Sequence, residues 1–527
     1  MTTSRPIDST GDGPFDPDAL TMDAVRAGIL RDRPVTVLGF ARSGIALARF
    51  LVDAGAQVTV YDGRPDRELR GAIDQLEGRA VRLLTGPAVD PARAWSGAAL
   101  VTTSPSINPD YPTTEPRLRA ALRALVEARR GGDAAAPALM SEPDLFLRLC
   151  PAPTIGVTGT KGKTTTSSLL AAVLAADPSH PVVLGGNIGI PLVERLPELT
   201  PDHRVVIELS ELQLPTLSRG TTVAVYTNVT SDHLDRHGTL AGYRAAKRRL
   251  AELVDSDGAL VLNADDPVVA AYAALGTARS VGYRQERPMA GGVGLVDGWI
   301  VADGVGRLPL AGRSRGPAPT GPGGRILPIE ELAIPGRHNV SNALAAVATA
   351  LLFGVAPDAI RRAAAGFTGV EHRLEPVGLI DGVRFVNDSQ GTQPDAVIAA
   401  LRAFEGPLVL IAGGRDKGVD LTGLAPVVAE RAAAAVLIGE SGADLETRFR
   451  AAGLARTERV ATLEEAVRTA DAIAREELAG GASEPATVLL SPAAASFDMF
   501  VDYAARGRAF KDAVAGIAAE RRTRGTR

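Results

Sequence analysis

Short apolar runs alternate with helix-periodic stretches over most of the chain, and this alternation is the first guide to its fold. At residues 35–40, "VTVLGF" is a short run of β-branched and aliphatic residues. The next stretch, 41–55, repeats its apolar residues with helical spacing and ends on glycine, and 56–62 is a second strand-like run. The pattern predicts a strand, a helix and a second strand in one βαβ unit.

The same alternation returns twice further along the chain. The runs "HRVVIELS" and "TVAVYTNV" alternate with helical patterns, and so do "PLVLIAGG" and "ATVLLSP". Strands that alternate with helices favour parallel sheets with crossover connections. We therefore predict an α/β protein of three tandem domains, in which Rossmann-like N-terminal and C-terminal domains flank a central P-loop ATPase-like domain. The predicted bounds are 34–145, 146–365 and 366–527.

Two segments depart from this pattern. Residues 1–33 form a predicted N-terminal tail, in which Gly, Pro, Ser and Asp crowd the first half and one helix is expected over 17–30. Residues 285–328, inside the central domain, are rich in Gly, Pro and Arg, and we predict a hairpin and a flexible insertion there. We assign no chemistry to either segment.

The composition narrows the class of protein. The chain has 527 residues, of which 45% are hydrophobic and 22% are charged, as expected for soluble globular domains. Its formal net charge of -4 gives no basic surface, so nucleic acid is not an expected partner. The single cysteine, Cys150, fits a reducing compartment, and no apolar run has the length of a membrane span or the form of a signal peptide. We expect a cytoplasmic protein without a membrane partner.

A glycine-rich turn between a predicted strand and a predicted helix is the strongest chemical signal. In "GVTGTKGKTTT", the backbone N–H groups of the turn and the positive end of the helix would converge on phosphate oxygens. Lys163 would reach the outer phosphates, and the Thr164 hydroxyl would bind Mg²⁺. Val157 stands where the Walker A pattern has its first glycine, so the match is the shorter run from Gly159 to Thr164. An ATP site is the working hypothesis, and a helix entry with incidental lysines is the alternative.

Acidic and imidazole side chains follow two further predicted strands. Glu208 ends one strand, and His233, between Asp232 and Asp235, follows another. Beside a triphosphate these groups would hold a divalent ion, although each alone also fits an ion-paired carboxylate or a hydrogen-bonded loop histidine. Lys247 lies on the next predicted helix, where spacing alone favours a solvated surface cation.

The first predicted strand-to-helix turn, "LGFARSG", is a weak dinucleotide-binding match because the middle glycine of G-x-G-x-x-G is missing. Such a turn still takes a diphosphate at its helix N-terminus. Asp62, at the end of the second strand, is either a ligand contact or a carboxylate that caps the local turn.

Many motifs, taken in order, resemble those of the Mur ligases, the ATP-dependent amino-acid-adding enzymes of peptidoglycan synthesis. The resemblance covers residues 33 to 515. The motifs are "GVTGTKGKTTT", "GGNIGIP", "ELSELQL", "TSDHLDRHG" with "YRAAK", "NADD", "GRHNVSNALAA", "HRLE" and "LLSPAAASFDMF".

The resemblance implies an enzyme, an ADP-forming ligase that makes an amide bond through an acyl phosphate. Among Mur ligases the motifs are most similar to those of members that add D-glutamate to UDP-N-acetylmuramoyl-L-alanine. That reaction is a cytoplasmic step of cell-wall biogenesis, on which cell shape and division depend. The resemblance further implies ATP and two Mg²⁺ ions, small-molecule substrates and a monomer.

Two alternatives stay open. One is another Mur-type or folylpolyglutamate-synthase-like ligase with a different amino acid or acceptor. The other is a P-loop ATPase or switch that ligates nothing.

The resemblance also assigns roles at the ATP site. The implied catalytic residues are Lys163, His233 and Lys247. The implied metal ligands are Thr164, Glu208, His233 and Lys247, the last as a carbamate, which turns a cation into an anionic ligand. The implied ATP contacts are Gly159, Thr160, Lys161, Gly162, Lys163, Thr164, Thr165, Asn263, Asn339, Arg373 and Asp388.

Two further sets of contacts are implied for the other substrates. The UDP-linked acceptor would contact Arg42, Ser43, Asp62, Arg64, Ser104 and Asn187. The incoming amino acid would contact Thr392, Lys417, Ser496, Phe497 and Tyr503. The family commonly has "NDSKATN" where this chain has "NDSQGTQ", with Gln390, Gly391 and Gln393 in place of lysine, alanine and asparagine. The lost positive charge bears on the preference between D- and L-glutamate.

Overall fold

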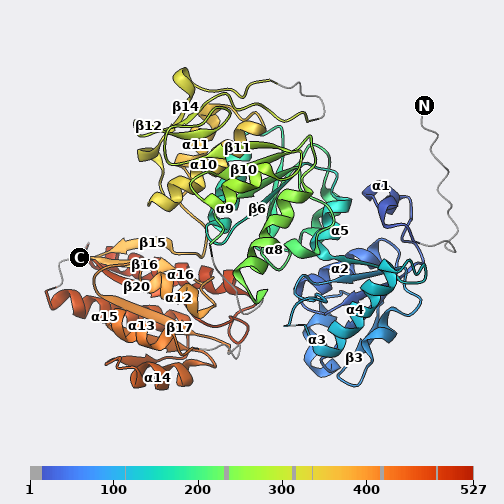
Figure 1. Cartoon of the computed structure of the whole chain (residues 1–527). Coiled ribbons are helices and arrows are strands. Elements are labelled where there is room, and N and C mark those ends of the chain that lie inside the picture. The colour runs from blue at the N-terminus through green and yellow to red at the C-terminus, as the bar shows by residue number, and fades with distance from the viewer. Residues whose placement is uncertain are drawn as a thin grey trace. The chain divides into compact units, whose positions relative to one another are not determined.

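The structure is a computed structural model, and it describes residues 15–112, 114–230, 237–310, 316–334, 336–415, 421–481 and 485–525 (Figure 1). Three β-sheets with flanking helices follow one another along these residues. The predicted fold class, an α/β protein with parallel-sheet domains in tandem, is confirmed. The predicted domain bounds stay predictions.

The first sheet is parallel throughout the described residues, with the strand order β3-β2-β1-β4-β5. β1 (Pro34–Leu38) pairs with β2 (Gln57–Asp62), and α2 (Arg42–Asp53) joins them, so the predicted βαβ unit is confirmed. The apolar face of α2 is buried through residues such as Leu47 and Leu51. The other elements here are β3 (Arg82–Thr85), β4 (Leu100–Thr103), β5 (Ala138–Ser141), α3 (Asp66–Asp74), α4 (Pro116–Arg130) and α5 (Glu142–Leu149).

The single helix predicted over 17–30 is wrong. The chain instead forms a 3₁₀ helix at Pro17–Ala19 and a short helix, α1, at Met22–Arg26. The two are separate because Thr21 is extended and its hydroxyl accepts a backbone N–H of the first turn of α1 at 3.1 Å, which starts a new helix. Gly28, with a φ of +93°, closes the C-terminal end of α1.

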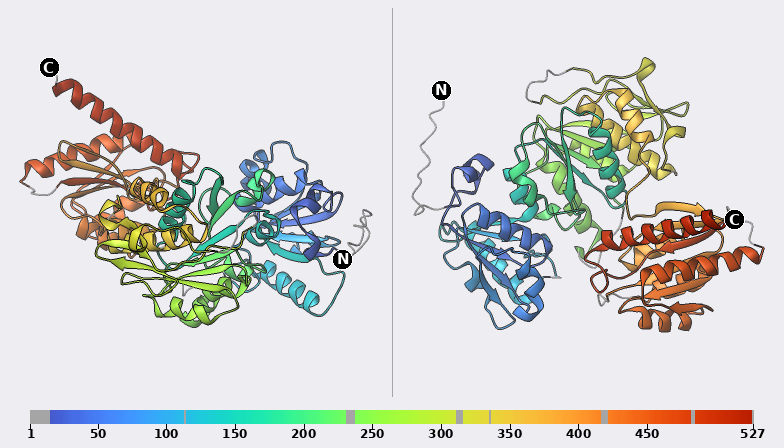
Figure 2. Two further views of the ribbon diagram at one scale, coloured as in Figure 1. Left: turned by 90° about the horizontal axis from the view of Figure 1, so that it is seen from above. Right: turned by 180° about the vertical axis from the view of Figure 1, so that it is seen from behind.

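The central sheet has the order β14-β13-β12-β11-β10-β9-β6-β8-β7 in the described residues, and it is parallel from β12 to β7. Helices cover both of its faces (Figure 2). On one face α6 (Lys163–Leu174) and α10 (Arg337–Leu352) pack with Val157, and on the other α8 (Leu240–Leu253) packs with Tyr226. The remaining elements are β6 (Thr154–Thr158), β7 (Val182–Gly186), β8 (Arg204–Glu208), β9 (Val223–Tyr226), β10 (Ala259–Asn263), β11 (Arg279–Tyr283), α9 (Pro267–Ala270) and α11 (Pro357–Ala365).

Residues 285–328 carry an antiparallel hairpin at the edge of this sheet. β12 (Val293–Val296) pairs with β13 (Trp299–Ala302), and β13 pairs in turn with β14 (Arg325–Pro328). Flexibility of the rest of this segment stays a prediction, and residues 311–315 lie outside the described ranges.

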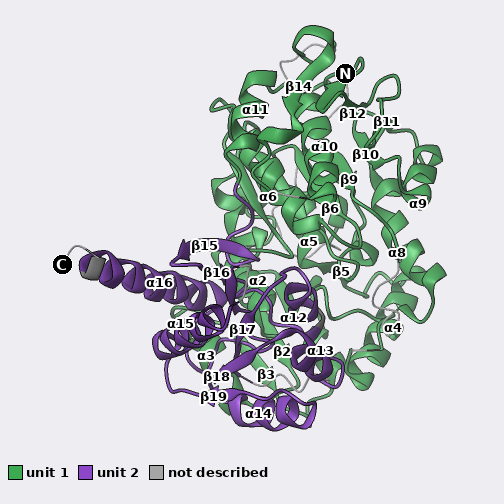
Figure 3. Cartoon of the chain, turned by 90° about the vertical axis from the view of Figure 1, so that its left-hand side faces the viewer, with its two compact units in different colours: residues 1–367 green, residues 368–527 purple. Residues whose placement is uncertain are grey.

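The first two sheets belong to one compact unit, residues 1–367, and the third sheet belongs to a second unit, residues 368–527 (Figure 3). The order of the third sheet is β15-β16-β20-β17-β18-β19 in the described residues, and only the pairing of β15 (Glu375–Ile380) with β16 is antiparallel there. β20 (Ala486–Leu490) lies between β16 (Val383–Asn387) and β17 (Leu408–Gly413). The carboxyl ends of these three strands therefore meet at one edge, where open α/β sheets bind ligands.

Helices also cover both faces of the third sheet, because its buried residues form two separate apolar clusters. None of the described helices is both long and apolar enough to cross a bilayer. The remaining elements are β18 (Ala434–Ile438), β19 (Thr457–Arg459), α12 (Pro394–Leu401), α13 (Leu424–Arg431), α14 (Gly442–Ala451), α15 (Leu463–Ala479) and α16 (Tyr503–Gly525).

Candidate active site

Two glycines shape the turn between β6 and α6. Gly159 has a φ of +151°, and a Cβ there would lie 1.9 Å from Thr227 Oγ1. Gly162 has a φ of +84°, and a Cβ there would lie 2.6 Å from Asn342 Oδ1. A side chain at either position would collide with a fixed polar group in a backbone conformation that L-residues rarely adopt. The turn leads directly into the N-terminus of α6, where free N–H groups and the helix dipole favour a bound phosphate.

Lys163, the first residue of α6, lies folded over this turn. Its Nζ donates to the carbonyl oxygens of Gly159 at 3.0 Å and Thr160 at 2.9 Å. Thr164 is buried on the first helical turn, next to the half-buried Thr165. A nucleotide phosphate would compete with the two carbonyls for the ammonium group. The structure thus places the predicted phosphate-binding residues in one turn, and their contacts with ATP stay predictions.

Two residues just after β9 hold the turn in place, and the sequence analysis missed both. The carbonyl of Asn228 accepts the N–H of Thr160 at 2.7 Å, and its Oδ1 accepts the N–H of Lys161 at 2.9 Å. The Thr227 hydroxyl donates to the carbonyl of Lys161 at 2.6 Å. The sequence shows these residues only as a polar pair at the end of a strand. Their contact with the turn depends on the pairing of β9 with β6, which the sequence does not show.

Lys247, on α8, is completely buried, with 0% of its surface exposed. Its Nζ donates to the Gly159 carbonyl at 2.9 Å and to Thr158 Oγ1 at 3.2 Å. The same nitrogen lies 5.6 Å from the centre of the Tyr243 ring. The interpretation of Lys247 as a solvated surface cation is therefore wrong. Lys163 and Lys247 donate to the same carbonyl oxygen, so both amines lie at the phosphate turn.

Two tyrosines fix Lys247 relative to the turn, and neither was predicted. The hydroxyl of Tyr226, a fully buried residue of β9, donates to the Lys247 carbonyl at 2.7 Å and accepts the N–H of Ala251 at 2.9 Å. It therefore contacts both members of one i,i+4 pair of α8. Tyr243 lies one helical turn before Lys247, and its hydroxyl is 2.9 Å from Thr160 Oγ1. The register of α8 is thus tied to β9 and to the phosphate turn.

Glu208, at the end of β8, is a buried carboxylate with a free oxygen. Its Oε1 accepts a hydrogen bond from Asn187 Nδ2 at 2.9 Å, whereas Oε2 is buried and has no hydrogen-bond partner among the described residues. A buried carboxyl oxygen without a partner is costly, and a divalent cation bound beside it would satisfy it. Glu208 therefore fits a magnesium site. His233 lies outside the described residues, and those residues contain no group of three or more His, Cys, Asp or Glu side chains arranged to hold a metal.

The two predicted ATP-contacting asparagines of the first unit lie on elements next to the turn. Asn263 ends β10, and its Nδ2 donates to the carbonyl of Thr227 at 2.7 Å. Asn339 is in the first turn of α10, where its Oδ1 accepts from Asn342 Nδ2 at 3.1 Å. Asn342 also faces the turn, because Thr166 Oγ1 donates to its Oδ1 at 3.2 Å.

Five of the six predicted UDP-contacting residues, all but Asn187, lie at the carboxyl edge of the first sheet. Asp62, at the end of β2, accepts the N–H of Phe40 at 2.8 Å and three hydrogen bonds from Arg64 at 2.8 to 3.0 Å. Burial alone would raise the pKa of Asp62, but the hydrogen bonds from Arg64 and Phe40 hold it below its ordinary value. The carboxylate is thus ionised and holds the local turn, as the capping interpretation predicts, and its contact with a ligand stays a prediction.

The other members of this set flank that turn. Arg42 and Ser43 begin α2, and Ser104 Oγ lies 3.2 Å from Ser106 Oγ in the loop after β4. Arg42 Nη1 donates to the carbonyl of Gly189 at 2.9 Å, two residues from Asn187 in the loop after β7. The first and central sheets therefore both contribute to this group of residues.

In the second unit, Asp388 follows β16 and is almost fully buried. Burial raises the pKa of its carboxyl to about 6, although Ser491, the Leu374 N–H and the charge of Arg373 oppose that rise. Ser491 Oγ donates to Asp388 Oδ2 at 2.6 Å. Gly391 makes this contact possible, since a Cβ there would lie 2.3 Å from the same oxygen. The glycine at this position thus has a physical reason in this chain.

The predicted amino-acid-binding residues lie around the same edge of the third sheet. Thr392 lies in the loop after β16, Ser496 is buried in the loop after β20, and Phe497 beside it is 63% exposed. Tyr503 begins α16, and its ring packs edge-on against His372 with a centroid distance of 6.2 Å. Lys417 lies outside the described residues.

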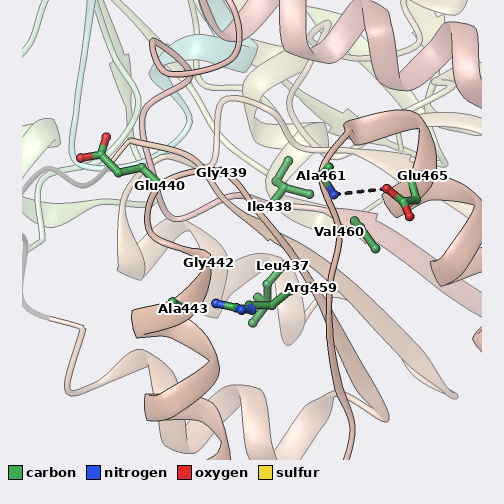
Figure 4. A pocket seen from close by; sticks show the side chains of 10 residues that line it. All are labelled: Leu437, Ile438, Gly439, Glu440, Gly442, Ala443, Arg459, Val460, Ala461 and Glu465. Carbon is green, nitrogen blue, oxygen red and sulfur yellow. Dashed lines mark hydrogen bonds between the residues drawn. The ribbon is translucent and has the colours of Figure 1, made fainter.

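A separate cavity of about 440 Å³ lies at the carboxyl ends of β18 and β19 (Figure 4). Its polar lining comes from Glu440, Arg459 and Glu465, and the N–H of Ala461 donates to Glu465 Oε2 at 3.2 Å. No predicted amino-acid-binding residue among those described lines this cavity. The described residues of the predicted amino-acid set lie instead in the loops after β16 and β20 and at the start of α16.

A glycine-rich turn with the half-buried Lys163, the buried Lys247 and a buried carboxylate with an unpartnered oxygen together fit the predicted site for a metal-bound nucleotide phosphate. Comparison with known proteins agrees with this class. Residues 157–295 match the family model of the Mur ligase middle domain, and residues 372–494 match that of the Mur ligase glutamate ligase domain.

Curated relatives extend the match over nearly the whole chain. The UDP-N-acetylmuramoylalanine–D-glutamate ligase of Symbiobacterium thermophilum is 38% identical, with 93% of this chain and 100% of the relative covered. The enzyme of the same name from Pelotomaculum thermopropionicum is 37% identical over 92% of this chain and 98% of its own. Among solved structures, MurF from Acinetobacter baumannii shares 17% identity over 92% of this chain and 97% of its own, with a TM-score of 0.48. The chain belongs to the Mur ligase family.

Proposed function

We propose that the chain is an ATP-dependent ligase that joins D-glutamate to UDP-N-acetylmuramoyl-L-alanine and releases ADP and phosphate. Membership of the Mur ligase family supplies the reaction type, and the names of the relatives supply the two substrates. The observation that carries the proposal is the convergence of Lys163 and Lys247 on the carbonyl oxygen of Gly159. A nucleotide switch needs the first lysine but has no use for a second, buried amine at the same turn.

In the first step the acceptor carboxylate attacks the γ-phosphorus of ATP, the bond to the bridging oxygen breaks, and ADP leaves. Two anions must approach each other, so fixed positive charge at the turn lowers the barrier. Lys163 Nζ would exchange the carbonyls of Gly159 and Thr160 for phosphate oxygens, and the N–H groups at the start of α6 would hold the rest of the phosphate. The product is an acyl phosphate.

Members of the family use ATP with Mg²⁺. We propose two ions, held by Thr164, Glu208, His233 and a carbamate on Lys247. The unpartnered Oε2 of Glu208 supports this assignment. A carbamate forms from a neutral amine and CO₂ with loss of a proton, and complete burial disfavours the charged form of an amine. When bound, the ions would neutralise charge between the two reacting anions.

In the second step the amine of D-glutamate attacks the acyl carbon, the tetrahedral intermediate expels phosphate, and the nitrogen loses its proton. Hydroxyl groups and an ammonium suit a ligand with two carboxylates, and we assign this role to Thr392, Lys417 and Ser496. Phe497 and Tyr503 would line the same site. Arg373 and Asp388 would contact the nucleotide.

The acceptor would be held through its UDP group at the first sheet. The N-terminus of α2, with Arg42 and Ser43, offers N–H groups to a diphosphate. Asp62 and Arg64 shape the turn beside it, with Ser104 and Asn187 nearby. We place the reaction in the cytoplasm, carried out by a monomer.

The test is an omission series with the purified full-length chain, ATP and Mg²⁺. Continuous ADP release, beyond the single equivalent that formation of the acyl phosphate gives, is expected only when UDP-N-acetylmuramoyl-L-alanine and D-glutamate are both present, together with a product heavier by one glutamyl residue in mass spectrometry. L-Glutamate and other amino acids belong in the same series, because this chain has Gln390 where the motif resemblance implies a lysine. Equal ADP release without an amino acid would leave only a nucleotide hydrolase, and faster ligation of another amino acid or acceptor would favour a different Mur-type or folylpolyglutamate-synthase-like ligase.

A further inference from the structure

Arg506, in the first turns of α16, is a cation buried in the second unit. Only 1% of its surface is exposed. It forms no ion pair within 4 Å among the residues that the structure describes. A buried guanidinium must have its donors satisfied, and here backbone oxygens and one hydroxyl do so.

The guanidinium joins two loops that are more than 100 residues apart in sequence. Nε donates to Ser389 Oγ at 3.0 Å, and Nη2 donates to the Ser389 carbonyl at 3.0 Å and to that of Ala494 at 3.2 Å. Nη1 donates to the carbonyls of Ala494 and Ala495, both at 3.3 Å. The guanidinium donates these hydrogen bonds from three nitrogens in one plane. A lysine ammonium has a single nitrogen and cannot reproduce the whole set.

A third loop is fastened to the same group. The N–H of Arg415, in the loop after β17, donates to the carbonyl of Ala495 at 2.9 Å. Gly414 packs so closely that a Cβ there would lie 2.2 Å from that carbonyl oxygen and 3.2 Å from Arg506 Nη1. The loops after β16, β17 and β20 therefore all meet at Arg506.

These three loops and the start of α16 carry the residues proposed for the amino acid. Thr392 lies in the Ser389 loop, and Ser496 directly follows Ala495. Tyr503 lies one helical turn before Arg506, and its carbonyl accepts Ser389 Oγ at 2.7 Å. We propose that Arg506 is the positioning residue of the amino-acid site: it sets the spacing of the three loops, so that their polar groups face one dicarboxylic amino acid.

The inference rests on the proposed function, because it concerns the amino acid that the ligase would add. It also predicts a property of the chain without any ligand. Arg506→Lys keeps a positive charge, but its three donors sit on one nitrogen, so it cannot reproduce the five hydrogen bonds that Arg506 makes to Ser389, Ala494 and Ala495. Arg508→Lys is the matched control, because Arg508 is exposed on the same helix.

Two measurements are made on the full-length variants. Hydrogen exchange of the unliganded chain should be faster in residues 389–392 and 493–496 together in Arg506→Lys, and unchanged in Arg508→Lys. In the ligation assay, Arg506→Lys should raise KM for D-glutamate at least about tenfold, while KM for the UDP-linked acceptor, assigned to the first unit, changes less than about twofold. Arg506→Met, which leaves the carbonyls without donors, should show the same selective change or fail to fold, so the lysine variant decides.

Unchanged exchange in both loops would overturn the inference. So would faster exchange with KM for D-glutamate unaltered, because Arg506 would then stabilise the loops without positioning the site. An equal rise in both KM values would likewise contradict it. If the wild-type chain ligated no D-glutamate, the proposed function would fail, while the exchange measurement would still report on the loops.

Discussion

The phosphate turn of the first unit and the amino-acid loops of the second unit are organised in opposite ways. The turn is local: Gly159, Gly162 and Lys163 lie within five consecutive residues, and their order already defines its shape. The loops of the second unit come from three strands and are joined by Arg506, far along the chain. A short motif thus specifies the phosphate site, which any nucleotide enzyme needs. The proposed amino-acid site depends instead on contacts between loops that are far apart in the sequence.

The largest effect is expected from Lys163→Ala. Loss of the ammonium at the turn should lower ligation by on the order of 10²- to 10³-fold, as for other preorganised charges that stabilise a transition state. Thermal unfolding should shift little, because the side chain is half-buried and its hydrogen bonds to described residues go to two carbonyls of its own loop. Wild-type turnover in this variant would remove the phosphate-site assignment.

Substitutions of Lys247 test whether this residue is a metal ligand, as a carbamate, or a structural cation at the phosphate turn. Lys247→Ala should lower ligation by about 10²-fold, the scale of a lost electrostatic group, and acetate should restore part of it by supplying a carboxylate. Lys247→Glu should retain more activity than Lys247→Arg, because the proposed role requires negative charge. Carbon-13 NMR of wild-type protein in labelled bicarbonate should show a carbamate resonance that the alanine variant lacks. An arginine variant as active as the wild type would end the two-ion interpretation.

The buried carboxyl of Asp388, in the second unit, should make the free energy of unfolding depend on pH. Its pKa is about 6 in the fold, above the ordinary value of 3.8. The folded state therefore binds this proton more tightly, so the carboxyl favours folding below about pH 4 and loses that contribution as pH rises through 6. Asp388→Asn stays neutral, so relative to wild type it should gain about 2 kcal/mol on going from pH 4 to pH 8. Urea unfolding at the two pH values measures this, and a difference independent of pH would contradict it.

Tyr226→Phe should give the smallest effect. It removes the hydroxyl that contacts both Lys247 and Ala251, at a cost of about 1 kcal/mol in the free energy of unfolding. Ligation should fall a few-fold, because Lys247 loses a restraint but not its own contacts. Tyr272→Phe is the control, since Tyr272 packs against Tyr226 with a centroid distance of 5.0 Å and its hydroxyl donates a long hydrogen bond, of 3.5 Å, to the carbonyl of Arg244. Equal effects in the two variants would argue against a specific link to Lys247.

Local patterns predicted the parts of the fold that depend on neighbouring residues. The βαβ unit from β1 to β2 and the glycine turn before α6 were both readable, because periodicity and turn chemistry act over a few residues. The helix expected over 17–30 was wrong for a local reason, since the hydroxyl of Thr21 starts a new helix.

The contacts that tie the sites together could not be read in this way. Asn228 reaches the phosphate turn because β9 lies beside β6. The local sequences of β9 and β6 do not show that these two strands are neighbours. The burial of Lys247 depends on how α8 packs, because its spacing alone is that of a surface residue. Arg506 gave no signal at all, since its partners lie in loops after β16 and β20.

The central claim is that the acceptor carboxylate is phosphorylated before the amide bond forms. UDP-N-acetylmuramoyl-L-alanine labelled with ¹⁸O in both carboxyl oxygens tests this directly, with ATP, Mg²⁺ and D-glutamate. The account predicts that each turnover transfers one ¹⁸O to inorganic phosphate and leaves one in the new amide, as mass spectrometry of both products would show. Phosphate without ¹⁸O, formed in step with the ligated product, would contradict it.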